Sequence, residues 1–312
     1  MCATDSKKGL PVVRQRPVLA FCLVGVWFSS GCNLSDMLDR EGNLRETMQY
    51  RAAYEDTLLE VARRFHLGYV EMVAANPGTD PWLPGEGASI ILPTVHLLPE
   101  AEHEGIVVNL ADMRLYFFEK PGAPPRSFPI GIGRDGLTTP LGSTTIVRKA
   151  KDPTWRPTVR MRAEDPTLAA VVPPGPDNPM GSRALYLGWP TYAIHGTNKP
   201  YGVGRRLSSG CVRMYPEDIE ELYELVGAGT KVVVMDQPVK LGWIDGDLYI
   251  EAHPNQQQSD QLEMTGQFDP ELPSAVVDQV IAAAGEQTRR LDWSRVRTAI
   301  LERRGYPIRV TH

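Results

Sequence analysis

His195 and Cys211 lie within one short segment, and this pair is the strongest candidate for chemistry in the chain. A cysteine acts as a nucleophile through its thiolate, and an ordinary thiol with a pKa of about 8.5 is mostly protonated at neutral pH. A neighbouring histidine can take that proton. The segment between the two residues should fold back as a loop, because glycine and proline interrupt it. These interrupting residues are Gly196, Pro200, Gly202, Gly204 and Gly210.

The residues just before the cysteine also suit acyl chemistry. Gly210 allows a tight turn, and we expect the consecutive N–H groups of Gly210 and Cys211 to point at a developing oxyanion. Ser208 and Ser209 keep the approach to the thiol polar. This stretch therefore predicts an oxyanion and substrate-binding turn.

The alternative interpretation is that both residues are ordinary. Free cysteine is among the most buried residue types, and a single histidine is more often a packed side chain than a base. The pairing favours catalysis, because the apolar run at residues 192–194 ends at His195. A strand there would present the histidine at its end, where active-site groups often lie.

A longer pattern around this pair resembles a known family. The motif 195–197, His-Gly-Thr, followed by 208–213, Ser-Ser-Gly-Cys-Val-Arg, resembles the signature of YkuD-type L,D-transpeptidases, cysteine enzymes that cross-link bacterial peptidoglycan. The glycine-rich stretch 131–136 and the Thr-Pro-Leu-Gly stretch 139–142 extend the resemblance over roughly residues 104–236. Many members carry a histidine where this chain has Ser209, so a substrate contact through that second histidine does not transfer.

The resemblance implies a mechanism and residue roles. Cys211 would attack the third-residue carbonyl of a tetrapeptide stem, terminal D-alanine would leave, and an amine would resolve the thioester. His195 would be the base, and the Gly196 carbonyl would orient it. Arg213 would pair with a stem carboxylate, or else form an ordinary salt bridge. The resemblance implies no metal and no organic cofactor.

Other functions remain open at this point. The acceptor amine would belong to a second stem peptide or to a protein tethered to the wall. With water as acceptor, the same nucleophile would make the protein an L,D-carboxypeptidase or a hydrolase. In a third alternative the protein is a non-catalytic scaffold that binds the wall.

Length and composition are typical of a soluble globular protein. The chain has 312 residues, 42% of them hydrophobic and 23% charged, which predicts two domains or one large domain with appendages. The formal net charge is -5, and no basic stripe interleaved with aromatic residues occurs. This pattern argues against nucleic acid as a partner.

Residues 1–32 are typical of an export signal. Basic residues precede an apolar run at 18–28 that is too short to span a bilayer, and small residues then lead to Cys32. This end resembles a bacterial lipoprotein cleavage box, in which Cys32 would carry a lipid anchor. Ordinary signal peptidase cleavage is the alternative, because Ser29 stands where an aliphatic residue is usual. Either kind of cleavage predicts that the mature protein is located in the cell envelope or periplasm.

Export makes the remaining cysteine more informative. Of the four cysteines, Cys2 and Cys22 would leave with the signal, and Cys32 would be acylated or removed. Cys211 would then be alone, without a partner for a disulfide or a thiolate metal site. A reactive nucleophile fits this solitary cysteine best.

Residues 48–93 predict a small α+β module. Strands at 49–52 and 88–92 should flank helices at 57–66 and 69–75, with Asp56 as the cap of the first helix. The order resembles a LysM module, a fold that holds N-acetylglucosamine glycans. A packing module that only positions the catalytic domain is the alternative.

The predicted catalytic domain, residues 104–236, is mainly β. Several short β-branched or aromatic runs, separated by glycine and proline, indicate a sandwich or barrel with one helix at 216–225. The expected strands are 106–110, 114–118, 127–132, 142–147, 185–187, 192–195 and 230–234. The proline-rich segment 152–182 should be a long loop that borders the cleft.

Residues 237–312 predict a hairpin and a short helical tail. The hairpin at 240–251 should turn at residues 245–247, and helices are expected at 273–285 and 293–304, with Asp292 capping the second. The stretch 256–259 is interpreted as a polar linker. His253 is expected to be structural rather than catalytic.

Overall fold

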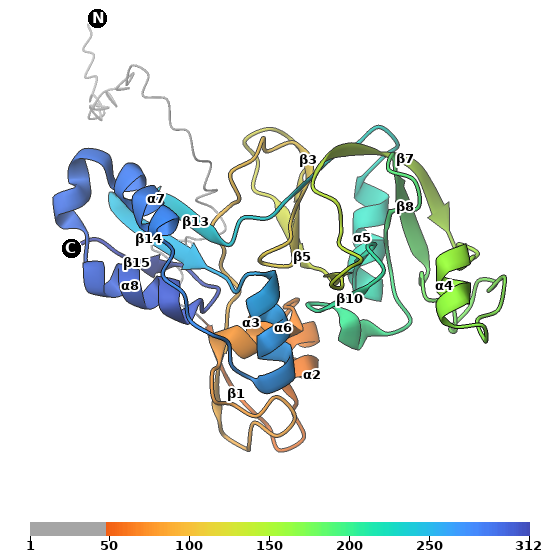
Figure 1. Ribbon diagram of the computed structural model, residues 1–312, viewed down its shortest axis with the longest axis horizontal. Helices are drawn as coiled ribbons and strands as arrows, with labels where there is room; N and C mark the ends of the chain where they lie inside the picture. Colours follow the sequence, from red (N-terminus) through yellow and green to blue (C-terminus); the bar gives the residue numbers. More distant parts are fainter. Residues whose placement is uncertain (1–47) are drawn as a thin grey trace, which may run out of the picture.

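The computed structural model describes residues 48–312, which form three parts (Figure 1). In Figure 1 the central region (residues 104–236) lies on the right, the C-terminal unit (residues 237–312) on the left, and the N-terminal unit (residues 48–93) below them, next to α6 of the C-terminal unit. The predicted export signal, with Cys32, lies outside the described residues. No helix within the described part of the chain is long and apolar enough to cross a membrane.

The N-terminal unit has the predicted strand–helix–helix–strand order. Its elements are β1 (Met48–Arg51), α2 (Leu58–Arg64), α3 (Tyr69–Ala75) and β2 (Ser89–Leu92), and β1 pairs antiparallel with β2. The predicted cap is wrong by one position, because the Thr57 side chain accepts the Glu60 N–H at the start of α2. Asp56 instead accepts hydrogen bonds from the Tyr50 hydroxyl, at 2.6 Å, and the Ala53 N–H, at 2.7 Å.

An eight-stranded mixed sheet forms the central region, which confirms the prediction of a mainly β fold. Its strands lie in the order β11-β9-β8-β7-β12-β3-β4-β5. Their bounds are β3 (Gly105–Asn109), β4 (Arg114–Phe118), β5 (Arg126–Pro129), β7 (Gly142–Lys151), β8 (Arg183–Leu187), β9 (Ala193–His195), β11 (Val212–Arg213) and β12 (Lys231–Met235). A separate parallel pair joins β6 (Ile132–Gly133) to β10 (Arg206–Ser208).

The sheet curls because its longest strand changes partners. The first half of β7 pairs with β12, and after an irregularity between Ile146 and Arg148 the second half pairs with β8. The two edges of the sheet then meet where Gly131, just after β5, bridges Arg213 of β11. This bridge explains why the predicted strand 127–132 is broken into β5 and β6. A Cβ at Gly131 would lie 2.4 Å from the Gly202 carbonyl oxygen, so the chain passes there only as glycine.

The central strands are buried on both faces. Leu115 of β4 belongs to the main core, while Tyr116 packs against Leu98 and Val107 on the opposite face. Helix α5 (Pro216–Leu225) has the predicted bounds, begins with proline at its first position, and buries Ile219 in the main core.

The proline-rich segment 152–182 contains a short helix, α4 (Val159–Glu164), with Thr158 as its cap. One buried side chain organises the rest of the segment. Asn178 donates to the carbonyls of Pro153, at 2.7 Å, and Pro173, at 3.1 Å, and accepts the Met180 N–H at 2.9 Å. The segment is therefore a folded loop fixed from within.

The C-terminal unit is a mixed α/β unit rather than a helical tail. Its hairpin, β13 (Val239–Ile244) and β14 (Asp247–Ala252), gains a third strand, β15 (Ile308–Arg309). The helices are α6 (Gln256–Thr265), α7 (Ser274–Ala284) and α8 (Trp293–Glu302), with a 3₁₀ turn at Gly285–Arg290. Asp292 caps α8 as predicted, but residues 256–259 begin α6 instead of forming a linker. Asn255 and Gln258 form a capping box there, and a polar sequence suits a helix with one buried side.

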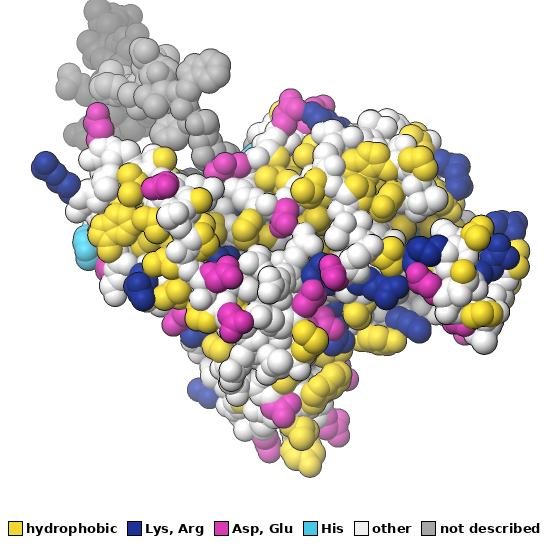
Figure 2. Space-filling model, viewed as in Figure 1, with side chains coloured by type: hydrophobic (Ala, Val, Ile, Leu, Met, Phe, Trp, Pro, Cys, Tyr) yellow, Lys and Arg dark blue, Asp and Glu magenta, His cyan; other side chains and the backbone are white. Residues whose placement is uncertain are grey.

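The surface carries charges of both signs. On the face shown in Figure 2, acidic and basic side chains occur over all three parts. The N-terminal unit also exposes four large apolar side chains, Met48, Tyr54, Trp82 and Leu83.

Candidate active site

His195 is the last residue of β9 and is buried. Its Nδ1 lies 2.6 Å from the carbonyl oxygen of Gly196. A carbonyl only accepts, so Nδ1 carries the hydrogen, and Nε2 of the neutral ring is the nitrogen free to take a proton. This contact gives Gly196 the orienting position that the family resemblance implies for it.

Strand pairing brings the cysteine to the same face. Strands β9 and β11 are parallel, with Val212 opposite Ile194 and Arg213 opposite His195. Side chains alternate along a strand, so Cys211, one residue before β11, shares a face with Arg213 and His195. A diagonal pair on neighbouring strands has Cα atoms about 8 Å apart, within reach of these two side chains. The Cys211 thiol is partly buried, and Sγ lies 3.6 Å from the Thr191 carbonyl oxygen.

The turn before Cys211 is held by Ser208. Gly210 has φ of +104°, and a Cβ there would lie 2.8 Å from the Tyr192 ring. The Gly210 N–H donates to Ser208 Oγ at 3.1 Å, and that hydroxyl donates to the Cys211 carbonyl at 2.5 Å. Gly210 and Ser208 therefore shape the turn, because their donors are used inside it instead of pointing at substrate as predicted. Ser209 lies in the same turn, partly exposed.

Thr139 is a site residue that sequence reasoning did not single out. Its hydroxyl donates to the Gly210 carbonyl at 2.9 Å and accepts the Gly133 N–H at 3.1 Å. The side chain is buried, so the Thr-Pro-Leu-Gly stretch fixes the nucleophile turn from the opposite side. The stretch itself was part of the family resemblance, which was the available signal.

The site carries one positive side chain, Arg213. Within residues 48–312 no carboxylate lies within 4.0 Å of its guanidinium. Burial and then the Arg213 charge lower the pKa of His195 to about 4, and burial raises the pKa of the Cys211 thiol. At neutral pH the resting pair is therefore a thiol beside a neutral imidazole.

The folded loop 152–182 closes one side of the site. Met180, placed by Asn178, packs with Trp155 against Cys211 and Ala193. An apolar wall beside the thiol limits water around it, which is consistent with the raised pKa of the cysteine.

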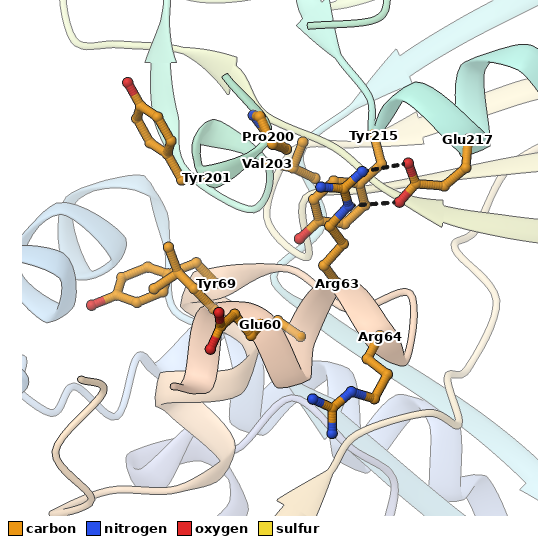
Figure 3. Close-up of a pocket in the computed structure, with 11 residues that line it drawn as sticks. Glu60, Arg63, Arg64, Tyr69, Pro200, Tyr201, Val203, Tyr215 and Glu217 are labelled. Carbon is orange, nitrogen blue, oxygen red and sulfur yellow. Dashed lines mark hydrogen bonds and ion pairs between the residues drawn. The ribbon is translucent and has the colours of Figure 1, made fainter. Parts of the chain in front are cut away.

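A pocket of about 470 Å³ lies between the N-terminal unit and the loop that joins His195 to Cys211 (Figure 3). Residues of α2 and the start of α3 line one side, and residues 200–203 and the start of α5 line the other. Its two arginines are already paired, because Arg63 binds Glu217 at 2.8 Å and Arg64 binds Asp56 at 3.0 Å, while the Glu60 carboxylate accepts hydrogen bonds only from Thr57.

One buried group outside the site has metal-binding residue types. His96, Glu251 and His253 place their ligand atoms within 4.8 Å of one another. The Lys240 ammonium lies 2.7 Å from Glu251 Oε1 and already supplies a positive charge. We therefore interpret this group as part of an ion network, and His253 has the structural position expected for it.

Comparison with known proteins agrees with this geometry and confirms the family resemblance. Residues 103–234 match the YkuD family, described as the L,D-transpeptidase catalytic domain. The chain is 43% identical over 255 residues to the probable L,D-transpeptidase YbiS of Escherichia coli strain K12, covering 80% of this chain and 81% of that protein. It is 39% identical over 257 residues to the probable L,D-transpeptidase ErfK/SrfK of the same strain, again covering 80% and 81%. The chain therefore belongs to the YkuD family of L,D-transpeptidases.

Proposed function

We propose that this protein is a peptidoglycan L,D-transpeptidase in which Cys211 is the nucleophile and His195 the base. The observation that carries the proposal is the parallel β9–β11 pair, which puts both side chains on one face with His195 Nδ1 bound to Gly196. Cys211 Sγ attacks the third-residue carbonyl of a tetrapeptide stem, and its proton passes to His195 Nε2. The amide bond to terminal D-alanine breaks, and that proton leaves with the amine.

An amine acceptor then resolves the thioester. It attacks the acyl carbon, loses a proton to His195, and expels the Cys211 thiolate, which regains a proton. Because the Gly210 N–H is occupied by Ser208, the Cys211 N–H is the turn donor that we assign to the oxyanion. Arg213, without a carboxylate partner in the described chain, is the group that would bind a stem carboxylate. Ser209 remains a predicted substrate contact.

The decisive experiment follows the products by mass spectrometry. Wild-type protein incubated with a tetrapeptide stem and an amine acceptor should release D-alanine and give a joined product. Cys211→Ala should give neither. Release of D-alanine without a joined product, at saturating acceptor, would instead make the protein an L,D-carboxypeptidase or hydrolase. Wall binding without any reaction would favour the non-catalytic scaffold.

We propose the glycan strand as the occupant of the pocket in Figure 3, which would give the LysM-like unit a binding role. Arg63 and Arg64 at its rim are already paired, so the pocket offers no free cation to an anionic ligand, and the half-exposed Tyr201 ring offers a flat face to a sugar ring. Titration with N-acetylglucosamine oligomers tests this assignment. Tyr201→Ala should abolish binding and Tyr54→Ala, an exposed tyrosine outside the pocket, should not. The reverse result would place the glycan instead at the exposed apolar side chains Tyr54, Trp82 and Leu83 of the N-terminal unit.

Export to the cell envelope is the location that we propose, supported by the signal-like residues 1–32. Lipidation at Cys32 would anchor the protein to a membrane. Mass spectrometry of the mature N-terminus distinguishes a diacylated Cys32 from an unmodified start beyond it.

The amine acceptor is either a second stem peptide or a protein tethered to the wall. The masses of the joined products distinguish these two acceptors.

A further inference from the structure

The N-terminal unit contacts the catalytic loop through main chain as well as through the Arg205 guanidinium, which lies over the Tyr69 ring. Helix α3 begins at Tyr69, and the first N–H groups of a helix have no partner within it. Here the Val70 N–H donates to the Gly204 carbonyl at 3.0 Å, and the Tyr69 N–H lies 3.5 Å from the Val203 carbonyl oxygen. The loop between His195 and Cys211 therefore supplies acceptors for the start of α3.

Two glycines make this contact possible. Gly204 has φ of +72°, and a Cβ there would lie 2.1 Å from the Tyr69 nitrogen and 2.3 Å from Gly68 Cα. A Cβ on Gly68 would lie 2.9 Å from Gly204 Cα. Ordinary contacts of this kind are 3.4–4 Å, so a side chain at either position forces the two segments apart.

The other side of the loop is packed just as closely. The Gly204 N–H donates to the Ile130 carbonyl at 3.1 Å, and Gly202 lies against Gly131. Gly131 and Arg213 exchange two hydrogen bonds of 2.8 Å. Residues 202–204 are thus held between α3 and residues 130–131, and a displacement at Gly204 reaches Arg213, two residues after Cys211, through two successive main-chain contacts.

The chain after Cys211 is fixed to the same unit. The Tyr215 hydroxyl donates to the Leu67 carbonyl at 3.1 Å, and His66 Nδ1 lies 2.8 Å from Asp218 Oδ1. Glu71 of α3 accepts the Gly68 N–H at 2.8 Å and binds Arg114 of β4, so the start of α3 is itself fixed to the sheet. Figure 3 shows α2 facing the 200–203 turn and the start of α5 across the pocket.

We propose that the N-terminal unit positions the catalytic cysteine, with Gly68 and Gly204 as the positioning residues. This inference rests on the proposed function. It gives residues 48–93 a role in the acyl-transfer step itself, apart from any binding to glycan. The unit supports the loop from behind, and neither glycine touches substrate.

The test compares three glycine-to-alanine variants on a tetrapeptide that carries no sugar. Gly204→Ala should lower kcat about 100-fold, as expected for a displacement of about 1 Å, with KM changed little. Gly68→Ala has a milder clash and no positive φ, so it should fold readily and lose about tenfold. Gly78→Ala is the matched control, because its φ of +80° imposes the same backbone strain with nothing within 4 Å of the new Cβ.

The outcomes separate this inference from a general loss of stability. Thermal unfolding is recorded for each variant, and kinetics are measured at a temperature at which all of them are folded. A fall in kcat for Gly68→Ala but not for Gly78→Ala supports positioning. Wild-type kcat in folded Gly68→Ala, with only a lower Tm, overturns it. Absence of turnover in wild-type protein would instead contradict the proposed function.

Discussion

The N-terminal and C-terminal units are held to the central region by different kinds of interaction. The N-terminal unit shares one apolar core with the sheet, in which Leu58 and Ile90 pack with Ile106 and Leu115. Most of the C-terminal unit packs in a separate core, containing Leu248, Ile250, Val280, Val296 and Ile300 among others, although Leu262 of α6 belongs to the main core. The first junction is thus one continuous core, whereas the second joins two distinct cores and shares only α6 with the main one.

A buried ion network crosses the second junction, beside a small apolar cluster in which Leu97 packs with Ile244. Lys240, at the start of the C-terminal hairpin, is fully buried between Asp112, at 2.9 Å, and Glu251, at 2.7 Å. The Tyr116 hydroxyl donates to Asp112 at 2.8 Å. His96, in the chain between the N-terminal unit and the sheet, lies 3.2 Å from Glu251 and 3.1 Å from Glu71. We call these residues the junction network, with Arg114 as the partner of Glu71.

The difference has a consequence for function. Close main-chain packing is insensitive to pH and salt, so it is suited to holding a catalytic loop in one place. A buried ion network depends on the protonation of its members. Removing one partner leaves another charge buried without compensation, and this costs more free energy than the intact pair contributes. The catalytic loop is attached to the first junction by main chain, and Arg205 and Arg206 at its end also pair with Glu263 and Asp260 of α6.

The largest expected effect is therefore at Lys240. Lys240→Met removes a buried ammonium and leaves the Asp112 and Glu251 carboxylates without their main counter-charge. We expect a loss of about 3–5 kcal/mol in the free energy of unfolding, measured by urea denaturation. Lys231→Met is the control, because this lysine pairs with Glu102 on the surface. Equal midpoints for the two variants would mean that the junction network is solvated.

The pH dependence of stability should identify the same network. Neighbouring cations lower the pKa of Glu251, Glu71 and Asp112 despite burial, so their contribution is complete above the ordinary carboxyl value and is lost as pH falls through the lowered pKa. Burial and Arg114 oppose the protonation of His96, but Glu251 and Glu71 outweigh them and raise its pKa. Its contribution is complete below the ordinary value of 6.5 and is lost as pH rises through the raised pKa.

Both contributions are complete between pH 4.5 and 6.5, the ordinary values for glutamate and histidine. The contribution of the junction network to the urea midpoint should be highest in that window and fall on each side, in addition to the loss of stability below pH 6.5 that the lowered pKa of His195 causes. His96→Gln, which cannot be protonated, should flatten the alkaline side and leave the acid side. An alkaline decrease that persists in this variant would assign the effect to another group.

The two buried histidines give a matching comparison for catalysis. His96 faces carboxylates, whereas His195 is buried beside Arg213, and its pKa is lowered to about 4. A base works only when neutral, so kcat/KM should be level from about pH 5 upward and fall tenfold per pH unit below about pH 4. Rates measured during short exposures to acid separate this decrease from unfolding. A midpoint near 6.5 would contradict the burial of His195.

Local sequence patterns predicted the helices and strands whose bounds are set by residues in the same short segment. The bounds of α3, β4 and α5 follow from apolar spacing and, for the two helices, from a glycine or proline at the start, and they agree with the predictions residue for residue. His195 and Cys211 were proposed from one short segment of sequence and the Gly196 carbonyl from the family resemblance, and the structure places the Gly196 carbonyl on His195 Nδ1. Burial of the pair and the raised pKa of the thiol were not predictable, since they depend on Met180 and the folded loop 152–182.

The features that sequence reasoning missed have partners far along the chain. From the sequence, Gly204 is an ordinary loop glycine, and only the structure shows that it packs against Gly68. In the same way, only the structure shows that the Thr139 hydroxyl donates to the Gly210 carbonyl. The capping error at Asp56 has a similar reason, because Tyr50 and Arg64 compete for that carboxylate. Spacing within a segment cannot reveal such contacts.

The smallest effect should come from the charged pair at the first junction. Arg63 and Glu217 form two hydrogen bonds of 2.8 and 2.9 Å across the pocket, but both side chains are more than two-fifths exposed. Water screens such a pair, so Arg63→Ala should lower the free energy of unfolding by at most about 1 kcal/mol. Urea denaturation checks the value, and turnover of a sugar-free tetrapeptide should stay at the wild-type level. A loss as large as that of Lys240→Met would show that charge, and not close packing, fixes the N-terminal unit to the catalytic loop.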